Sequence, residues 1–362
     1  MKKFPLILSL VLIISLLAGC AGTPVVYYTN CTCPVGTHDA APEEPKADET
    51  PAPAVEGALK TGLYISTAVD GSTPANAEAD GAASYNVLMA AVLVDDKGVI
   101  VDCIIDGISA TVNFNAVGEI TSDLTVAPQT KNELGDNYGM RVASSIGAEW
   151  NEQVAEIAKF AIGKTVEEFE QGAISETGKA PDGSDLATKA TMYMSSYVNA
   201  VKMAAANAKH LGAEAGDVLK MGVITGISSS ASATAEKAGN AQLDVDVTAL
   251  TMNGDVITSC VIDAVQAKVA FDAAGVITSD ISVPVATKNE LGEKYGMVAW
   301  GKAQFEWNVQ AAEFAAYVTD KTVEQVAGIN ITEENKPADV DLSAKVTIKI
   351  NGFMDLIAKA AK

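Results

Sequence analysis

Histidine is almost absent from this sequence: among 362 residues, only His38 and His210 carry an imidazole. His38 lies in a proline-rich N-terminal segment, and His210 is the last residue of the first of two repeated segments, at their junction. The body of neither repeat therefore has a histidine for nucleophilic catalysis or for a zinc site. No G-x-S-x-G motif, phosphate-binding loop or dinucleotide-binding glycine motif stands after a predicted strand and before a predicted helix. A hydrolase is disfavoured, and any redox chemistry would have to be carried by a cofactor.

Positive charge is scarce as well. Lys and Arg total 25 against 46 Asp and Glu, which gives a formal net charge of −21. A surface of this sign repels nucleic acid and anionic lipid headgroups, so nucleic-acid binding is excluded. Cys31 and Cys33 form a C-x-C pair with only His38 nearby, and this set is incomplete for a tetrahedral zinc site. We therefore expect an exposed cysteine pair and no metal site.

The N-terminus carries the clearest functional signal in the sequence. Lys2 and Lys3 precede an apolar stretch, residues 4–17, which is short for a membrane span and is typical of an export signal. The following Leu-Ala-Gly-Cys, ending at Cys20, resembles the lipobox of bacterial lipoproteins, in which the cysteine is modified with diacylglycerol and the chain is cut before it. The resemblance implies a signal peptide over residues 1–19 and a lipid anchor on Cys20. The mature protein would then lie on the outer side of the cytoplasmic membrane.

Residues 20–56 are predicted to be a tether between this anchor and the rest of the chain. The part from 39 to 56 consists mainly of Pro, Ala and acidic residues, with almost nothing to bury. Such a composition favours an extended chain that holds the folded part away from the membrane.

The remainder of the chain is a tandem duplication. T-K-N-E-L-G-D-N-Y-G-M begins at Thr130, and T-K-N-E-L-G-E-K-Y-G-M begins at Thr287, a shift of 157 positions (287 − 130). The same shift relates three further pairs: Cys103 and Cys260, Asp106 and Asp263, Trp150 and Trp307. So many coincidences at one spacing indicate two copies of one unit. We place the first repeat at 57–210 and the second at 217–362, each long enough to bury a core of its own.

Each repeat is predicted to be α+β, with antiparallel β-hairpins packed against helices. Strands over 87–94 and 99–105, and over 244–249 and 256–262, flank turn sequences, Asn253-Gly254 being the clearest. A second hairpin is expected over 112–126 and 269–283. An apolar stripe at steps of three and four predicts a helix over 142–161 and its counterpart over 299–318. Capping-box spacing predicts short helices after Thr165 and Thr322. Hairpins followed by helices, without βαβ alternation, indicate the α+β class and not a parallel sheet.

The repeated T-K-N-E-L-G-x-x-Y-G-M segment has two interpretations. Tyr138, Met140 and Trp150 could enclose a flat ring, with Lys131 near a phosphate. Alternatively the apolar residues close the core, Glu133 caps the helix and the glycines form the turn. Cys103 and Cys260, each flanked by apolar residues, are predicted to be core thiols.

The closing part of the first repeat carries a resemblance to a known family. Asp185-Leu-Ala-Thr188-Lys189-Ala190-Thr191, together with the opening hairpin, is similar to the FMN-binding domain family. That family includes the C subunit of the sodium-pumping NADH:quinone reductase and two-domain flavin lipoproteins of Gram-positive extracellular electron transfer. Its motif is D-x-x-[S/T]-G-A-T, and a flavin transferase joins FMN to the last threonine. Here Lys189 replaces the glycine. The resemblance implies Thr191 as the attachment residue, with Asp185 and Thr188 as motif residues.

The second repeat keeps less of this motif. In Asp341-Leu-Ser-Ala-Lys-Val-Thr347, only the aspartate and the last threonine match. The resemblance implies Thr347 as the second candidate attachment residue. Alternatively, apolar and polar residues alternate from 342 to 350, which predicts an amphipathic strand with Thr347 exposed on its charged face.

The resemblance as a whole implies an extracytoplasmic lipoprotein that carries covalent FMN and transfers electrons, without turning over a substrate of its own. Its implied partners are the membrane, through the anchor, a flavin transferase and a membrane dehydrogenase. The alternative is a non-redox surface lipoprotein whose repeats bind a ligand or a partner.

Overall fold

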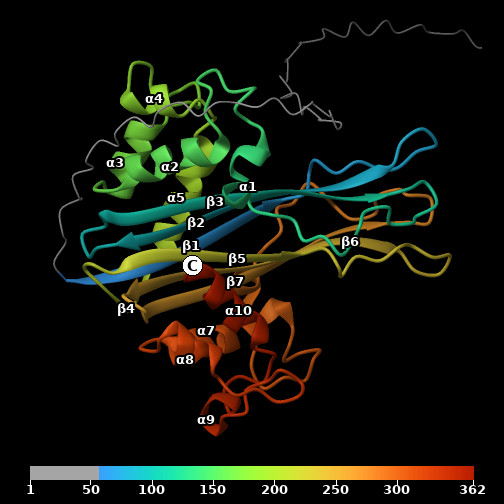
Figure 1. Ribbon diagram of the computed structural model, residues 1–362. Coiled ribbons are helices and arrows are strands. Elements are labelled where there is room, and N and C mark those ends of the chain that lie inside the picture. The colour runs from blue at the N-terminus through green and yellow to red at the C-terminus, as the bar shows by residue number, and fades with distance from the viewer. Residues whose placement is uncertain (1–56) are drawn as a thin grey trace, which may run out of the picture. The chain divides into compact units, whose positions relative to one another are not determined.

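The computed structural model describes residues 57–362 (Figure 1). The predicted signal peptide, the lipidation site Cys20, the tether, Cys31, Cys33 and His38 lie outside the described residues. Within 57–362, no helix has both the length and the apolar character that a membrane span requires.

The first repeat contributes a four-stranded antiparallel sheet. Its strands are β1 (Ala58–Ala68), β2 (Gly81–Val94), β3 (Ile100–Phe114) and β4 (Lys209–Glu214), in the order β3-β2-β1-β4. Asp95 Oδ1 accepts the backbone N–H groups of Lys97 and Val99, and Gly98 adopts a φ of 81°, so the turn forms where it is predicted.

The second repeat contributes a three-stranded antiparallel sheet. It consists of β5 (Val218–Gly226), β6 (Gly239–Asn253) and β7 (Val256–Phe271), in the order β5-β6-β7. Gly254 has a φ of 61°, as the predicted tight turn requires. The antiparallel α+β class is confirmed in both repeats.

The helices follow each sheet in the same order. In the first repeat they are α1 (Lys131–Leu134), the 3₁₀ turn η1 (Gly135–Tyr138), α2 (Trp150–Ala161), α3 (Val166–Ala173), α4 (Asp185–Lys189) and α5 (Ser195–Asn207). In the second they are α6 (Lys288–Leu291), η2 (Gly292–Tyr295), α7 (Trp307–Val318), α8 (Val323–Ala327), α9 (Val340–Ser343) and α10 (Asn351–Ala360). The capping boxes at Thr165 and Thr322 are both present, so these helix starts are confirmed.

Two predicted extensions of these elements are wrong. The second hairpin has no returning strand, because only the isolated bridges Phe114–Ile120 and Phe271–Ile277 form there. Helices α2 and α7 begin at Trp150 and Trp307 and not at residues 142 and 299, and Val142 is 90% exposed. The carboxylate of Glu149 accepts the backbone N–H groups of residues 140 and 141, which holds the preceding chain out of helical conformation.

The predicted amphipathic strand over 342–350 is also wrong. Leu342 lies in α9, and the next residues form local turns, with the Val346 N–H donating to the Leu342 carbonyl. The predicted burial holds only in part: Leu342, Val346 and Ile350 are buried and Thr347 is exposed, but Ala344 is exposed and Ile348 is half-buried. The apolar side chains reach the core from irregular backbone instead of from a strand.

The two sheets pack face to face and share a core. Each sheet also carries its own helices on its other face, as Figure 1 shows for α2, α3 and α5 on one and α7, α8 and α10 on the other. In the shared core the rings of Phe114 and Phe271 stack with centroids 4.0 Å apart and planes 4° apart. These two residues are counterparts, so an approximate two-fold axis relates the repeats. Each repeat thus has a core of its own and half of a common one.

Candidate functional site

The T-K-N-E segment is fixed to the preceding strand in the same way in both repeats. Thr130 and Glu133 form a capping box at the start of α1. Asn132 donates its side-chain N–H to the Ile105 carbonyl at 2.9 Å, and its backbone N–H donates to Asp106 Oδ1 at 3.1 Å. In the second repeat Thr287, Asn289, Glu290 and Asp263 make the equivalent bonds. Every polar residue of this segment therefore has a structural partner.

The aromatic residues beside this segment form a closed cluster. Trp150 is 3% exposed and donates its indole N–H to the Tyr197 hydroxyl at 2.9 Å. The Lys131 ammonium lies 5.0 Å from the ring centroids of both Tyr138 and Trp150, a cation–π arrangement. The Lys131 ammonium therefore faces the aromatic pair. This geometry matches the interpretation in which the segment closes the core.

The candidate flavin-attachment threonines both bind a buried glutamine. The backbone N–H and the hydroxyl of Thr191 donate to Gln153 Oε1 at 2.9 and 3.3 Å. Those of Thr347 donate to Gln310 Oε1 at 2.7 and 3.1 Å. Gln153 and Gln310 are 0% exposed, and sequence reasoning missed both. The signal was present, because the two glutamines are also related by the shift of 157.

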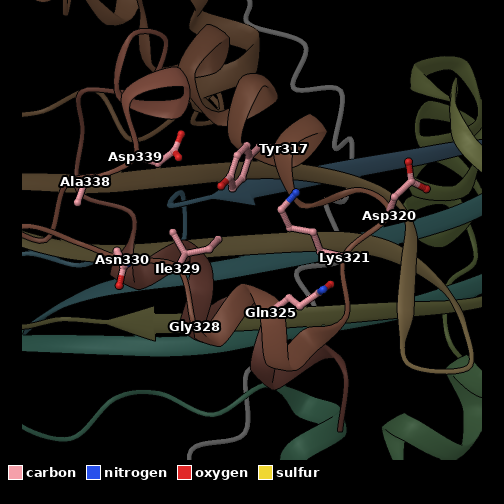
Figure 2. Close-up of a pocket in the computed structure, with 9 residues that line it drawn as sticks. All are labelled: Tyr317, Asp320, Lys321, Gln325, Gly328, Ile329, Asn330, Ala338 and Asp339. Carbon is pink, nitrogen blue, oxygen red and sulfur yellow. The ribbon is translucent and has the colours of Figure 1, made fainter.

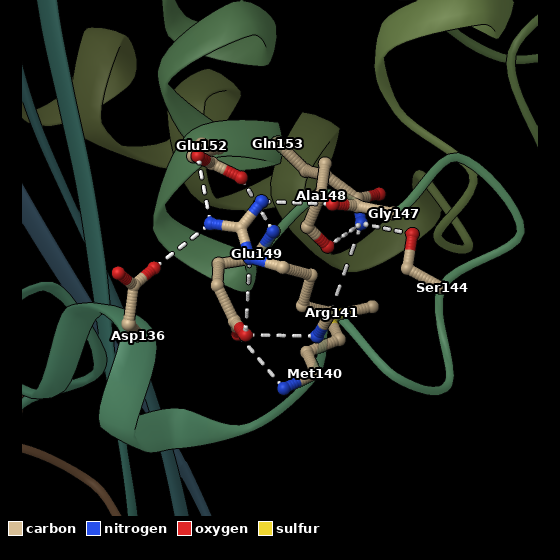
Figure 3. Close-up of polar contacts among 9 residues, drawn as sticks. All are labelled: Asp136, Met140, Arg141, Ser144, Gly147, Ala148, Glu149, Glu152 and Gln153. Carbon is tan, nitrogen blue, oxygen red and sulfur yellow. Dashed lines mark hydrogen bonds and ion pairs between the residues drawn. The ribbon is translucent and has the colours of Figure 1, made fainter. Parts of the chain in front are cut away.

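Gln153 also binds the segment before its own helix. Figure 3 shows its side-chain N–H pointing to the Ser144 hydroxyl and to the Ala148 carbonyl, each at 3.2 Å. In the same view Arg141 reaches Asp136 and Glu152, at 2.8 and 3.0 Å. The glutamine thus joins the loop before α2 to the closing segment that contains Thr191, which is a structural role for the threonine.

The other motif residues are explained by ion pairs and turns. Lys189, which replaces the family's glycine, pairs with Asp185 and with Glu156, each at 3.0 Å. Its counterpart Lys345 pairs with Glu313 at 2.7 Å, so the second ion pair occurs in both repeats. The Thr188 hydroxyl donates to the carbonyl of residue 185 at 2.7 Å, and Asp341 is exposed in α9. The structure does not gather these side chains around one ligand position.

One cavity lies within the second repeat, beside α7 and α8. It has a volume of about 480 Å³, and Figure 2 shows Tyr317, Lys321 and Asp339 among the residues around it. The Lys321 ammonium lies 4.2 Å from the Tyr317 ring centroid. Most of its lining residues are polar or charged.

A larger cavity of about 690 Å³ lies between the two repeats. The first repeat supplies part of β1 and the end of α5, the segment after it supplies Leu211 of β4, and the second repeat supplies residues from β7, α6 and α7. Its apolar lining includes Leu63, Ile65, Leu211, Val261 and Ile262. Neither Thr191 nor Thr347 lines either cavity. Because the larger cavity needs both repeats, no motif within one repeat could reveal it.

The charged groups of the larger cavity are Asp263, Glu290 and Lys209. Burial raises the pKa of Asp263 to about 6, although its Oδ1 accepts two backbone N–H groups. Burial also raises the pKa of the lining thiol of Cys260 to about 12, so the thiol stays protonated and unreactive at neutral pH. Cys260 and Cys103 are both buried and free, so their prediction as core thiols is confirmed.

Comparisons with known proteins add no identity. No family model, no curated protein and no solved structure matches this chain. Within residues 57–362, His, Cys, Asp and Glu side chains form no group of three or more that could hold a metal ion.

Proposed function

We propose that this protein is a lipid-anchored, extracytoplasmic ligand-binding protein whose two repeats together form one binding site. The observation that carries the proposal is the cavity of about 690 Å³ between the repeats. Small-molecule sites are typically concave, roughly 300–1,000 Å³ in volume, mostly apolar and supplied with a few convergent polar groups. The inter-repeat cavity combines these properties. The location rests on the export signal and the lipobox ending at Cys20.

A cavity-filling substitution tests this function. Ala312 lines the inter-repeat cavity, and its counterpart Ala155 is an equally exposed alanine on α2 that lines neither cavity. We expect 2-phenylethylamine, 2-phenylethanol or phenylacetate to shift the amide NMR signals of the cavity lining in the full chain. Ala312→Trp should abolish these shifts by occupying the space, and Ala155→Trp should leave them. The function is contradicted if no probe shifts these signals, or if both variants behave alike.

A flavin carrier in electron transfer is the second candidate function. It is favoured by the equivalent placement of Thr191 and Thr347, each of which directs its hydroxyl proton to a buried glutamine. Esterification would replace that hydroxyl proton with the phosphate, so the hydroxyl bond to the glutamine would be lost and the backbone N–H of each threonine would keep its own bond to it. Thr347 is exposed and Thr191 is half-buried, so the structure favours Thr347, although its motif is the more degraded. FMN would supply one- and two-electron chemistry. A flavin transferase and a membrane dehydrogenase would be the partners.

The intact mass of the full chain, co-expressed with a flavin transferase, tests this candidate. We expect a gain of one FMN less water that Thr347→Ala removes, and a second gain, if present, that Thr191→Ala removes. Thr177→Ala is the matched control, because this exposed threonine lies outside the motif and its hydroxyl bonds only to that of Ser175. An unshifted mass from a colourless protein would rule out covalent flavin.

A further inference from the structure

The two repeats carry the same carboxylate at the same point of the same segment, but these carboxylates have different partners. Glu133 and Glu290 each close a capping box. Glu133 Oε1 also binds the ammonium of Lys359 at 2.5 Å. Lys359 belongs to α10 of the other repeat, so this ion pair crosses between the repeats. In this half of the molecule, the carboxylate of Glu133 is therefore already paired with the ammonium of a lysine side chain.

In the other half, the sequence supplies no such cation. The closing segments are related by a shift of 156, which brings Thr191 onto Thr347 and Tyr197 onto Phe353, and which brings Met203 onto Lys359. A methionine thioether carries no charge and cannot replace the ammonium. Within residues 57–362, Glu290 forms no ion pair, and it lines the inter-repeat cavity instead.

We propose that the inter-repeat cavity binds a primary organic amine whose ammonium group pairs with Glu290, as Lys359 pairs with Glu133. This inference rests on the proposed ligand-binding function and assigns its ligand class. The apolar wall formed by Leu63, Ile65 and Val261 accommodates the hydrocarbon or aromatic body of the amine. The carboxylate is thus paired within the protein in the first repeat, at Glu133, and is available to the ammonium of a ligand in the second repeat, at Glu290.

The charges around the cavity favour a cation over an anion. Two carboxyl groups, those of the buried Asp263 and the exposed Glu290, line it against one ammonium, that of the exposed Lys209. The formal net charge of −21 adds a long-range attraction for cationic ligands. An anionic ligand would meet unfavourable charge both at the protein surface and within the cavity.

Three probes that share one aromatic body test the inference on the full chain. We expect 2-phenylethylamine to bind at least tenfold more tightly than 2-phenylethanol, and phenylacetate to bind most weakly, in NMR titrations of the cavity amides.

Glu290→Gln keeps the capping box and should remove the preference for the amine. Glu133→Gln makes the same change outside the cavity and should leave the preference intact. Met203→Lys introduces an intramolecular ammonium and should weaken amine binding.

The outcomes separate this inference from the function on which it rests. If the alcohol binds as well as the amine, or if Glu290→Gln leaves the preference unchanged, the cavity still binds ligands and the amine assignment is overturned. If none of the three probes binds, the ligand-binding function itself is overturned. A loss of preference in both glutamine variants would also overturn the assignment, because it would indicate a global charge effect.

Discussion

Two buried aspartates make the stability of the protein depend on pH. Burial raises the pKa of Asp106 and of Asp263 from 3.8 to about 6. Between pH 4 and 6 the folded chain therefore binds more protons than the unfolded chain. The stabilisation from this protonation is fully present below about pH 4 and is lost as the pH rises through 6.

Replacing Asp106 with asparagine should remove half of this dependence. Asparagine is neutral, and its side-chain oxygen can still accept the backbone N–H groups of residues 107 and 132. We expect Asp106→Asn to gain roughly 1–3 kcal/mol of unfolding free energy relative to wild type between pH 4 and pH 7.5, measured by urea unfolding. Asp123→Asn is the control with the opposite sign, because hydrogen bonds from Thr125 lower the pKa of Asp123. The prediction would be contradicted if the unfolding free energies of Asp106→Asn and wild type changed equally with pH.

Single residues were predictable where the sequence itself repeats. The core thiols, the capping boxes and the turn glycine Gly254 all follow from residue type and spacing. Gln153 was not predictable as the partner of Thr191, because 38 positions separate the two residues and a buried amide has no periodic signature. The candidate attachment residues consequently stay predictions, and the structure explains their hydrogen bonds without a ligand.

At the scale of elements, the packing of α5 on β1 depends on a glycine. A Cβ at Gly62 would lie 2.0 Å from the backbone carbonyl oxygen of Ala204. Because this obstacle is backbone, the helix would have to move. We expect Gly62→Ala to cost about 2 kcal/mol or more of unfolding free energy, as overpacking of a rigid contact does. Gly226→Ala is the matched control in β5, where a Cβ would meet nothing within 4 Å. Equal effects of the two substitutions in denaturant unfolding would contradict this account.

Element types were more predictable than element bounds. Apolar residues at helical spacing suggested a helix from residue 142, but the carboxylate of Glu149 binds the backbone just before Trp150 and starts the helix there. Alternation from Leu342 to Ile350 suggested a strand, but no neighbouring strand pairs with this segment. Sequence periodicity reported only part of the buried set, since Val142 and Ala344 are exposed, and it does not report which backbone partner is available.

At the scale of the whole molecule, the sandwich of sheets was the main feature that the sequence did not disclose. The run from Met89 to Leu93 is buried on both faces. Met89, Ala91 and Leu93 pack in the core shared with the other sheet, and Ala90 and Val92 pack against the helices. A run buried on both sides indicates two covering layers. It does not indicate that the second layer is the other repeat, and for the same reason the inter-repeat cavity could not be foreseen.

The shared core should make the two repeats unfold together. Phe114 and Phe271 are both 0% exposed and stack on each other across the approximate two-fold axis. Two reciprocal backbone hydrogen bonds, from Ala75 to Gly275 and from Ala233 to Gly118, add to the contact. Separate domains with small interfaces unfold in separate steps, whereas domains with a common core lose it together. We therefore expect a single calorimetric transition whose van't Hoff and calorimetric enthalpies agree.

Phe114→Ala tests whether this coupling passes through the stacked rings. Removing a buried phenylalanine typically costs about 3–5 kcal/mol, and here the cavity would open against both sheets. Amide exchange should therefore accelerate in β6 and β7 as well as in β2 and β3. Phe169→Ala is the comparison, because Phe169 packs in the core between the first sheet and its helices. If the repeats unfold together, it also accelerates exchange in β6 and β7, through the common transition. If Phe114→Ala accelerated exchange in the first repeat alone, or if wild type melted in two steps, the repeats would be independent. The inter-repeat cavity would then lack the rigid frame that a binding site requires.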